Sequence, residues 1–147
     1  MKQISYVMVK PEFANDQRVI DEVKARLKAN GIEILDEGFI RYDKSRAKRH
    51  YHEHIHREFY PKLEAYITGD KAYGMRVEGE NAIAVIRELA GPTNNPEAGS
   101  IRYDIPKMLG KEMRMTENVI HSSDKPESAK LELEIFDELL NESEEEI

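Results

Sequence analysis

The stretch ISYVMV at residues 4–9 decides how the rest of the chain is arranged. It is rich in β-branched and apolar residues, which is typical of a strand that is buried on both faces of a sheet. Lys10-Pro11 follows directly and ends it, because proline cannot donate to a β-ladder. We therefore expect this strand in the middle of a sheet.

Strand and helix patterns alternate outward from this first strand. Asn15 is predicted to cap a helix whose apolar stripe is Val19, Ile20, Val23 and Leu27. Further strands are expected at 32–40, with Gly38 at a bulge, at 72–78 and at 118–120, and further helices at 44–51, 58–68 and 82–90. A closing helix is expected from a cap at Asp124 through Leu140, while residues 101 to about 115 show no clear pattern.

This element order predicts an α+β fold, the ferredoxin-like βαββαβ sandwich. Its four-stranded antiparallel sheet would be covered by helices on one face, with an added C-terminal helix. A length of 147 residues fits one domain, which we place at 1–140, followed by an acidic tail at 141–147.

Composition excludes several classes of protein. With 39% hydrophobic and 35% charged residues the chain is typical of a soluble globular protein. The sequence has no apolar run long enough for a bilayer and no signal peptide at its start, so a cytoplasmic location with no membrane partner is expected. The absence of cysteine excludes disulfides, thiolate metal sites and cysteine catalysis.

The net charge of −7 is unevenly distributed. Residues 137–147 hold six acidic side chains and no basic one, and without those six charges the rest of the chain carries −1. The nearly neutral body is compatible with an anionic substrate, and the acidic run is typical of a solvated segment. No basic stripe is present that would indicate nucleic-acid binding.

The commonest nucleotide-binding motifs are absent. Gly74 to Gly79 has the glycine spacing of a P-loop, but Glu80 follows where lysine is required, and there is no G-x-G-x-x-G. Bound phosphates would therefore be held by side chains. The candidates are Lys10, Arg87, Thr93 and Arg102, each of which taken singly is more typical of solvated surface or turn chemistry.

A series of short segments, considered together, indicates a protein family more specifically than any single residue does. In chain order these are VMVKPE (7–12), HY (50–51), REFY (57–60), RELAGPTN (87–94), SIRYD (100–104) and NVIHSSDKPESA (118–129). This series, spread over residues 3–136, resembles the nucleoside diphosphate kinases, of which the chain would be a divergent member. The resemblance implies a ping-pong transfer of the γ-phosphoryl group from a nucleoside triphosphate to a nucleoside diphosphate. His121 would carry the phosphoryl group, and neutral imidazole suits that role because it needs no general base.

The resemblance also implies roles for other residues. Glu132 would hold the second nitrogen of His121, and Ser123 would lie beside the histidine with Glu127 as its hydrogen-bonding partner. Lys10, Tyr51, Arg87, Thr93 and Arg102 match the positions that bind phosphate, Asn118 and Lys10 those that contact the sugar, and Phe59 and Leu63 those that contact the base. Mg²⁺ would be held mainly by the nucleotide phosphates. Base tolerance would be broad, and a homo-oligomer, a hexamer or a tetramer, is implied.

Some residues depart from the family pattern. Ser122 stands where the family has glycine beside the histidine, Tyr103 replaces a glycine next to Arg102, and the 94–117 region has an altered length. These departures leave open an alternative, a nucleotide-binding homologue with weak or no turnover.

The run HYHEHIH offers a different alternative. His50, His52, His54 and His56 are spaced so that pairs of imidazoles share a face, which is compatible with Zn²⁺ or Ni²⁺ binding. No carboxylate or cysteine partner is fixed beside them, so the simplest interpretation is a solvated surface patch.

Overall fold

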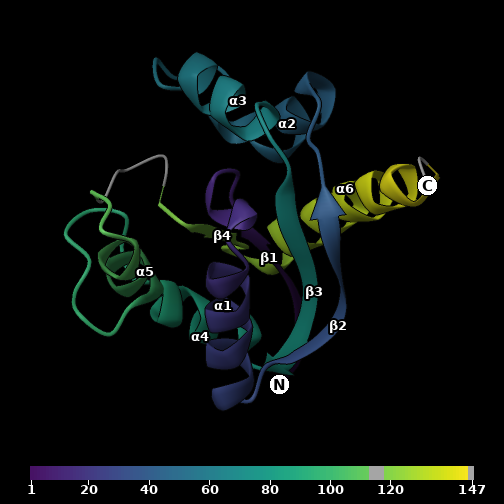
Figure 1. Cartoon of the computed structure of the whole chain (residues 1–147). Coiled ribbons are helices and arrows are strands. Elements are labelled where there is room, and N and C mark those ends of the chain that lie inside the picture. Colours follow the sequence, from purple (N-terminus) through teal and green to yellow (C-terminus); the bar gives the residue numbers. More distant parts are fainter. Residues whose placement is uncertain (113–117, 146–147) are drawn as a thin grey trace.

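The computed structural model describes residues 1–112 and 118–145. Its sheet has four antiparallel strands, β1 (Lys2–Val9), β2 (Glu33–Ile40), β3 (Ala72–Glu80) and β4 (Ile120–Ser122), in the order β2-β3-β1-β4 (Figure 1). The predicted ferredoxin-like fold is confirmed, and β1 lies in the interior of the sheet between β3 and β4.

Six α-helices accompany the described strands. They are α1 (Gln17–Ala29), α2 (Lys44–His50), α3 (Tyr60–Thr68), α4 (Ala82–Ala90), α5 (Ile101–Leu109) and α6 (Pro126–Glu145), with short 3-10 turns η1 (Phe13–Asn15) and η2 (His52–His54). Helix α5 occupies the stretch for which the sequence showed no pattern. Within the described part of the chain, none of these helices is both long and apolar enough to cross a membrane.

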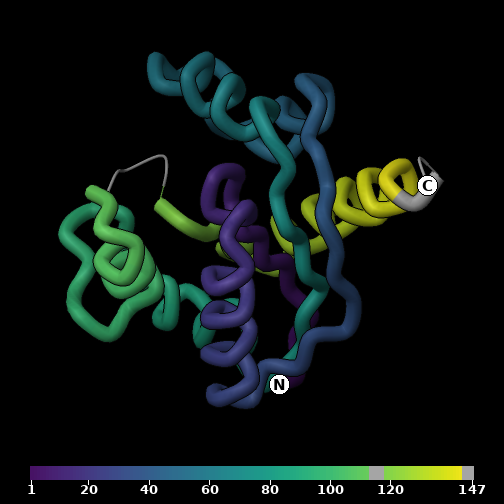
Figure 2. Tube along the Cα trace, in the orientation of Figure 1, coloured from purple at the N-terminus to yellow at the C-terminus, as the bar shows by residue number. Residues whose placement is uncertain are grey.

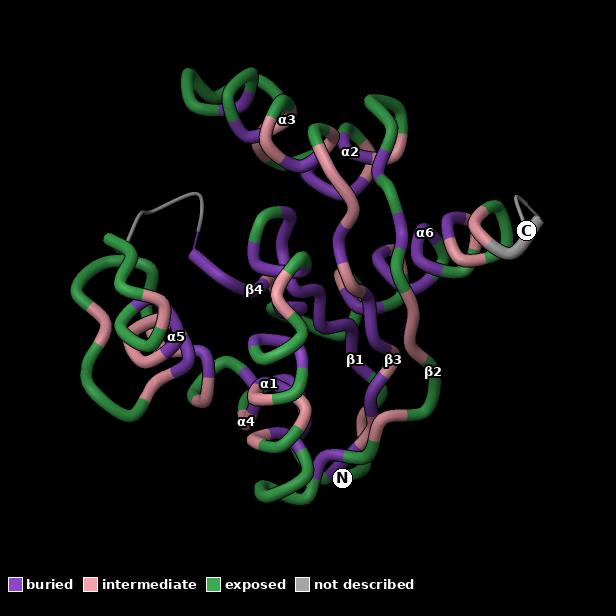
Figure 3. The backbone as a smooth tube through the Cα atoms, viewed as in Figure 1, coloured by how far each residue is buried: buried purple, intermediate pink, exposed green. Residues whose placement is uncertain are grey.

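Helices cover both faces of the sheet, so the expectation of helices on one face was wrong. Val7, Val9 and Met75 pack against α1, α4 and α5 on one face. Tyr6 and Met8 pack on the other face, against α2, α3 and α6. Figure 3 shows β1 buried along its second half, because alternate side chains of this strand enter two different cores.

Two local predictions are corrected by the structure. The cap of α1 is Asp16, whose side chain accepts a hydrogen bond from the backbone N–H of Arg18, and Asn15 belongs to η1. The irregularity in β2 lies between Ile34 and Asp36, while Gly38 pairs in register with Gly74. Gly38 instead leaves room for α6, since a Cβ atom there would lie 2.6 Å from Leu140 Cδ1.

Helix α6 closes the face of the sheet opposite α1. It packs against β1 and β2, and the chain trace in Figure 2 shows it as the yellow segment crossing behind the strands. The helix continues to Glu145, beyond residue 140 where an acidic tail was expected to begin. Glu142 in this segment pairs with Arg46 of α2.

Candidate active site

A cavity of about 650 Å³ opens between the α2–α3 segment, α4, β4 and the start of α6. Every predicted site residue except Ser123 and Glu127 lines this cavity, namely Lys10, Tyr51, Phe59, Leu63, Arg87, Thr93, Arg102, Asn118, His121 and Glu132. These residues come from seven separated segments of the chain. The fold therefore brings the predicted set together at one place.

The backbone before His121 has an unusual conformation. Val119 has a φ of 80°, a region that β-branched residues rarely adopt, and its neighbours close a tight turn in which Ile120 N–H donates to Asn118 O at 3.0 Å. The Val119 carbonyl accepts a 2.8 Å hydrogen bond from the backbone N–H of Lys10. This strained turn aims Asn118 into the cavity at the point where β4 begins, a use of strain that is typical of functional sites.

His121 is held through one of its two ring nitrogens. Its Nε2 lies 2.9 Å from Oε1 of Glu132, and the same carboxylate oxygen accepts a 2.7 Å hydrogen bond from Ser123 Oγ. Ser123 is fully buried and is fixed in turn by backbone hydrogen bonds to Tyr6. The predicted pairing of Ser123 with Glu127 was wrong, because Glu127 is exposed and Glu132 takes that place.

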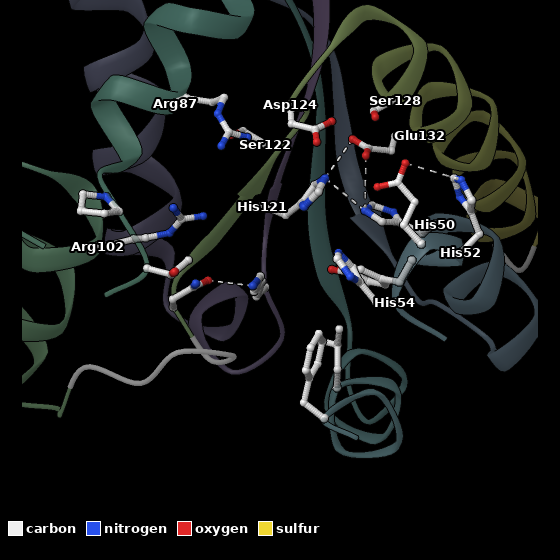
Figure 4. Close-up of a pocket in the computed structure, with 18 of the residues that line it drawn as sticks. His50, His52, His54, Arg87, Arg102, His121, Ser122, Asp124, Ser128 and Glu132 are labelled. Atoms are coloured by element: carbon white, nitrogen blue, oxygen red, sulfur yellow. Dashed lines mark hydrogen bonds and ion pairs between the residues drawn. The ribbon is translucent and has the colours of Figure 1, made fainter. Parts of the chain in front are cut away.

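His50 is a site residue that sequence reasoning assigned to a surface patch. It is buried, and its Nε2 lies 3.1 Å from Nε2 of His121 (Figure 4). Its Nδ1 lies 2.9 Å from the hydroxyl of Tyr42, which is 3.0 Å from the hydroxyl of Tyr6. The sequence did contain one indication that His50 is buried. It lies three residues after Ala47, and residues with this spacing share a face of a helix, here the buried face of α2. Burial holds the pKa of His50 well below its usual value, so its imidazole is neutral.

Lys10 and Asn118 form a buried polar pair in the cavity wall. Lys10 Nζ donates to Asn118 Oδ1 at 2.7 Å, and both side chains are more than nine-tenths buried. Burial, with a smaller effect from the charge of Arg102, lowers the pKa of Lys10 to about 7. An ammonium group in this position is destabilised until an anion comes near, which favours binding of phosphate.

Arg102 reaches into the cavity from the first turn of α5. Its guanidinium donates to Gly91 O at 2.6 Å and to Ile120 O at 3.0 Å, which fixes its plane, and burial lowers its pKa to about 10. Its Nε and the hydroxyl of Tyr51 are buried and have no hydrogen-bond partner among the described residues. Buried polar atoms of this kind are costly, and an anionic ligand would satisfy them.

Arg87, at the end of α4, completes a cationic side of the cavity. Figure 4 shows Arg87 and Arg102 on one side of His121, with His50 and Glu132 on the other. The apolar side lies at the start of α3, where Leu63 within the helix is buried and Phe59, the residue just before it, is 44% exposed. An apolar residue with this exposure beside the cavity is not part of the hydrophobic core, and it is free to contact a ligand.

The chain also matches known proteins. The family model for nucleoside diphosphate kinase matches residues 3–139. The chain belongs to the nucleoside diphosphate kinase family. Curated relatives of that name are 38% identical over 138 residues in Methanobrevibacter smithii, covering 92% of this chain and 87% of the relative, and 37% identical in Methanocaldococcus jannaschii, covering 92% and 94%.

Solved structures of nucleoside diphosphate kinases share the fold. The enzyme from Halobacterium salinarum in complex with CDP has a TM-score of 0.82 at 28% identity, covering 92% of this chain and 88% of that one. The enzyme from Aquifex aeolicus has a TM-score of 0.80 at 26% identity, covering 92% and 95%. The predicted family and enzyme class are confirmed, and a metal-binding protein built on His50–His56 is not favoured.

The departures from the nucleoside diphosphate kinase pattern lie in different places. Ser122 pairs with Val7 in the sheet and lines the cavity beside His121. Tyr103 lies on α5, with Lys107 5.9 Å from its ring, and is not among the cavity residues. Residues 113–117 of the altered 94–117 region lie outside the described residues. Ser122 is therefore the departure that bears directly on the site.

Proposed function

We propose that this chain moves the γ-phosphoryl group of a nucleoside triphosphate to a nucleoside diphosphate in two steps, with His121 as the carrier. The observation that carries the proposal is the hydrogen bonding of the His121 ring. Among the described residues, both of its hydrogen bonds use Nε2, one to Glu132 and one to His50. A proton on Nε2 leaves the lone pair on Nδ1, the nitrogen available to a substrate.

In the first step Nδ1 of His121 attacks the γ-phosphorus. The new N–P bond forms as the bond to the bridging β-phosphate oxygen breaks, and the nucleoside diphosphate leaves with that electron pair. The imidazole becomes positively charged, and the Glu132 carboxylate 2.9 Å from Nε2 stabilises that charge. A second diphosphate reverses the step and regenerates neutral His121.

The cationic side of the cavity supplies the groups that hold the phosphates. Lys10, Arg87 and Arg102 provide positive charge, while Tyr51 and Thr93 provide hydroxyl donors. Burial raises the pKa of Tyr51, so its phenol remains protonated and able to donate. These donors stabilise charge that spreads over the equatorial phosphoryl oxygens in the transition state.

A divalent cation fits this arrangement. The carboxylates of Glu53 and Asp124 line the same cavity, and hard cations such as Mg²⁺ prefer oxygen ligands. Mg²⁺ carried by the nucleotide would be held mainly by the phosphates. The two carboxylates could accept hydrogen bonds from water molecules bound to the ion. The ion neutralises phosphate charge, and the residues of the chain orient the reacting groups.

The opposite end of the cavity is suited to the nucleoside. The exposed ring of Phe59 and the side chain of Leu63 offer stacking and apolar contact, which do not read the hydrogen-bonding edge of a base. The Lys10–Asn118 pair supplies polar atoms for the sugar hydroxyls. Broad tolerance among bases follows from this chemistry.

Isotope labelling tests the proposal. With Mg²⁺ and γ-labelled ATP, the protein should acquire an acid-labile, base-stable label that GDP removes. His121→Gln should abolish labelling, whereas His56→Gln, which changes an exposed histidine outside the cavity, should label normally. Persistent labelling of His121→Gln would exclude His121 as the carrier.

Self-association is proposed from the open edge of the sheet. Strand β2 is an edge strand of the described sheet and exposes Leu35 and Phe39, which are 43% and 38% exposed. Exposed apolar side chains on an unpaired edge favour pairing with a second copy of the chain, from which a tetramer or hexamer can be built. Analytical ultracentrifugation of Leu35→Asp should show smaller species than the wild type.

A further inference from the structure

Three side chains of types that can ligate a metal ion, His50, His121 and Glu132, meet in the wall of the cavity. His50 Nε2 lies 3.1 Å from His121 Nε2, which lies 2.9 Å from Glu132 Oε1. His50 Nε2 is also 3.9 Å from Glu132 Oε2. One donor atom from each residue lies within 4.8 Å of the others, and Figure 4 shows the three side chains converging.

These separations are close to those of a tetrahedral zinc site. Zn–N and Zn–O distances of about 2.0–2.2 Å place neighbouring ligand atoms roughly 3.3–3.5 Å apart. His121 Nε2 lies 2.9 Å from Glu132 Oε1 and 3.1 Å from His50 Nε2, a few tenths of an ångström less than this range. The other carboxylate oxygen, Glu132 Oε2, lies 3.9 Å from His50 Nε2, a few tenths of an ångström more. All three residues also line the cavity, through which an ion and a water ligand can enter.

Outer hydrogen bonds hold two of the three donors in ligating orientations. The Tyr42 hydroxyl lies 2.9 Å from His50 Nδ1, and when Nδ1 carries the proton the lone pair of His50 is on Nε2, facing the cluster. Ser123 Oγ donates to Glu132 Oε1 at 2.7 Å. Partners that orient ligating imidazoles and carboxylates in this way are a regular feature of protein metal sites.

We propose that His50, His121 and Glu132 form a binding site for Zn²⁺, or a chemically similar transition-metal ion, and that the bound ion prevents His121 from accepting a phosphoryl group. Two imidazoles and one carboxylate suit zinc rather than Mg²⁺, which prefers oxygen. This site differs from the histidine run at 50–56, because the exposed His52 and His56 take no part in it.

Inhibition follows from the two tautomers of one imidazole. A metal bound to Nε2 of His121 uses the lone pair of that nitrogen, so the single proton of the neutral ring moves to Nδ1. Nδ1 then has no lone pair for attack on phosphorus. This half of the inference rests on the proposed role of His121, whereas metal binding itself rests only on the three donors.

Cobalt substitution tests binding without nucleotide. Protein freed of metal by a chelator is titrated with Co²⁺, which gives intense visible absorption in tetrahedral nitrogen and oxygen coordination. We expect one equivalent to bind and Zn²⁺ to displace it. His50→Gln and the near-isosteric Glu132→Gln should lose the absorption, and Tyr42→Phe should weaken binding about 10-fold or more.

His56→Gln is the matched control and should bind Co²⁺ like the wild type. Circular dichroism of each variant distinguishes loss of a ligand from loss of the fold. Equal absorption in His50→Gln and wild type, or no tetrahedral absorption in the folded wild type, would overturn the site.

Labelling with Mg²⁺ and γ-labelled ATP then tests inhibition. The fraction of protein that can be labelled should fall in proportion to bound Co²⁺, and recover when the ion is removed by chelation. Full labelling of the metal-loaded protein would contradict the inference that a metal on Nε2 of His121 prevents phosphorylation at Nδ1. If metal-free protein takes up no label, the proposed function fails, while the cobalt spectrum still reports on the site.

Discussion

At the scale of single residues, Lys10 connects proton binding to phosphate binding. Its pKa of about 7 in the free protein, set by burial and then by Arg102, leaves it mostly neutral at pH 8. A bound phosphate raises the pKa again, so binding of a nucleoside diphosphate should take up close to one proton at pH 8 and weaken as pH rises above about 7. Calorimetry in two buffers of different ionisation enthalpy measures this uptake.

Lys10→Met provides the comparison. It should bind the diphosphate more weakly at pH 6, and its uptake of protons at pH 8 should be much smaller. A binding enthalpy of the wild type that does not depend on the buffer would contradict the assignment.

Ser122 adds a hydroxymethyl group beside the nucleophile. It is buried in β4 and lines the cavity, so its side chain restricts the approach of the phosphoryl group. Ser122→Gly should speed formation of the phosphoenzyme about threefold, equivalent to roughly 0.7 kcal/mol of barrier. It should also lower stability by about 0.5–1 kcal/mol, because glycine is more flexible in the unfolded chain. Rapid-quench labelling measures the rate, and an unchanged rate would show that Ser122 is no obstacle.

At the scale of elements, the docking of α6 depends on a glycine in β3. A Cβ atom at Gly74 would lie 2.7 Å from two ring carbons of Phe136, which is fully buried and has little room to move. Gly74→Ala should therefore destabilise the protein by about 1–3 kcal/mol, measured by urea denaturation. Gly38→Ala meets Leu140, a partly buried side chain with a flexible end, and should cost less. Equal costs would contradict this account of the packing.

Elements with a clear local pattern were predictable from the sequence. The strand at 4–9 is a nearly continuous apolar run, and the first helix has an apolar stripe from Val19 to Leu27. Helix α5 was missed because Pro106 interrupts it and only one face of a short helix is buried. Spacing also says nothing about which face of the sheet a helix covers, and so the expectation of helices on one face was wrong. Tertiary packing decides both whether a short helix such as α5 forms and which face of the sheet a helix covers.

The site could be predicted only in part. The resemblance named residues that the fold gathers at one cavity, including His121 and Arg102. The inward orientation of His50 and the bond from Ser123 to Glu132 were missed, because each depends on how α2 and α6 pack against β1 and β4. Contacts between elements distant in the chain have no local pattern.

At the scale of the whole molecule, ion pairs join α2 to α6 and so relate His50 to Glu132. Arg49 pairs with Glu138 at 2.8 Å, and Arg46 contacts both Glu138 and Glu142. Hydrogen bonds from Arg49 and then Arg46 lower the pKa of Glu138 to about 2. A carboxyl group with a lowered pKa in the folded state stabilises the protein above its unfolded pKa of about 4.5, and that stability is lost as pH falls toward 2.

Glu138→Gln should remove this contribution. Glu138 is 40% exposed, so solvent screening reduces the effect to about 1 kcal/mol at pH 7 and low salt. The difference in urea stability between wild type and variant should be largest above pH 5, shrink as pH falls through 4, and decrease in 1 M salt. Glu33→Gln, at an exposed position in β2, serves as the control and should match the wild type. A difference that stays constant from pH 7 to pH 3 would show that Glu138 stabilises α6 through packing, since only the charge titrates in that range.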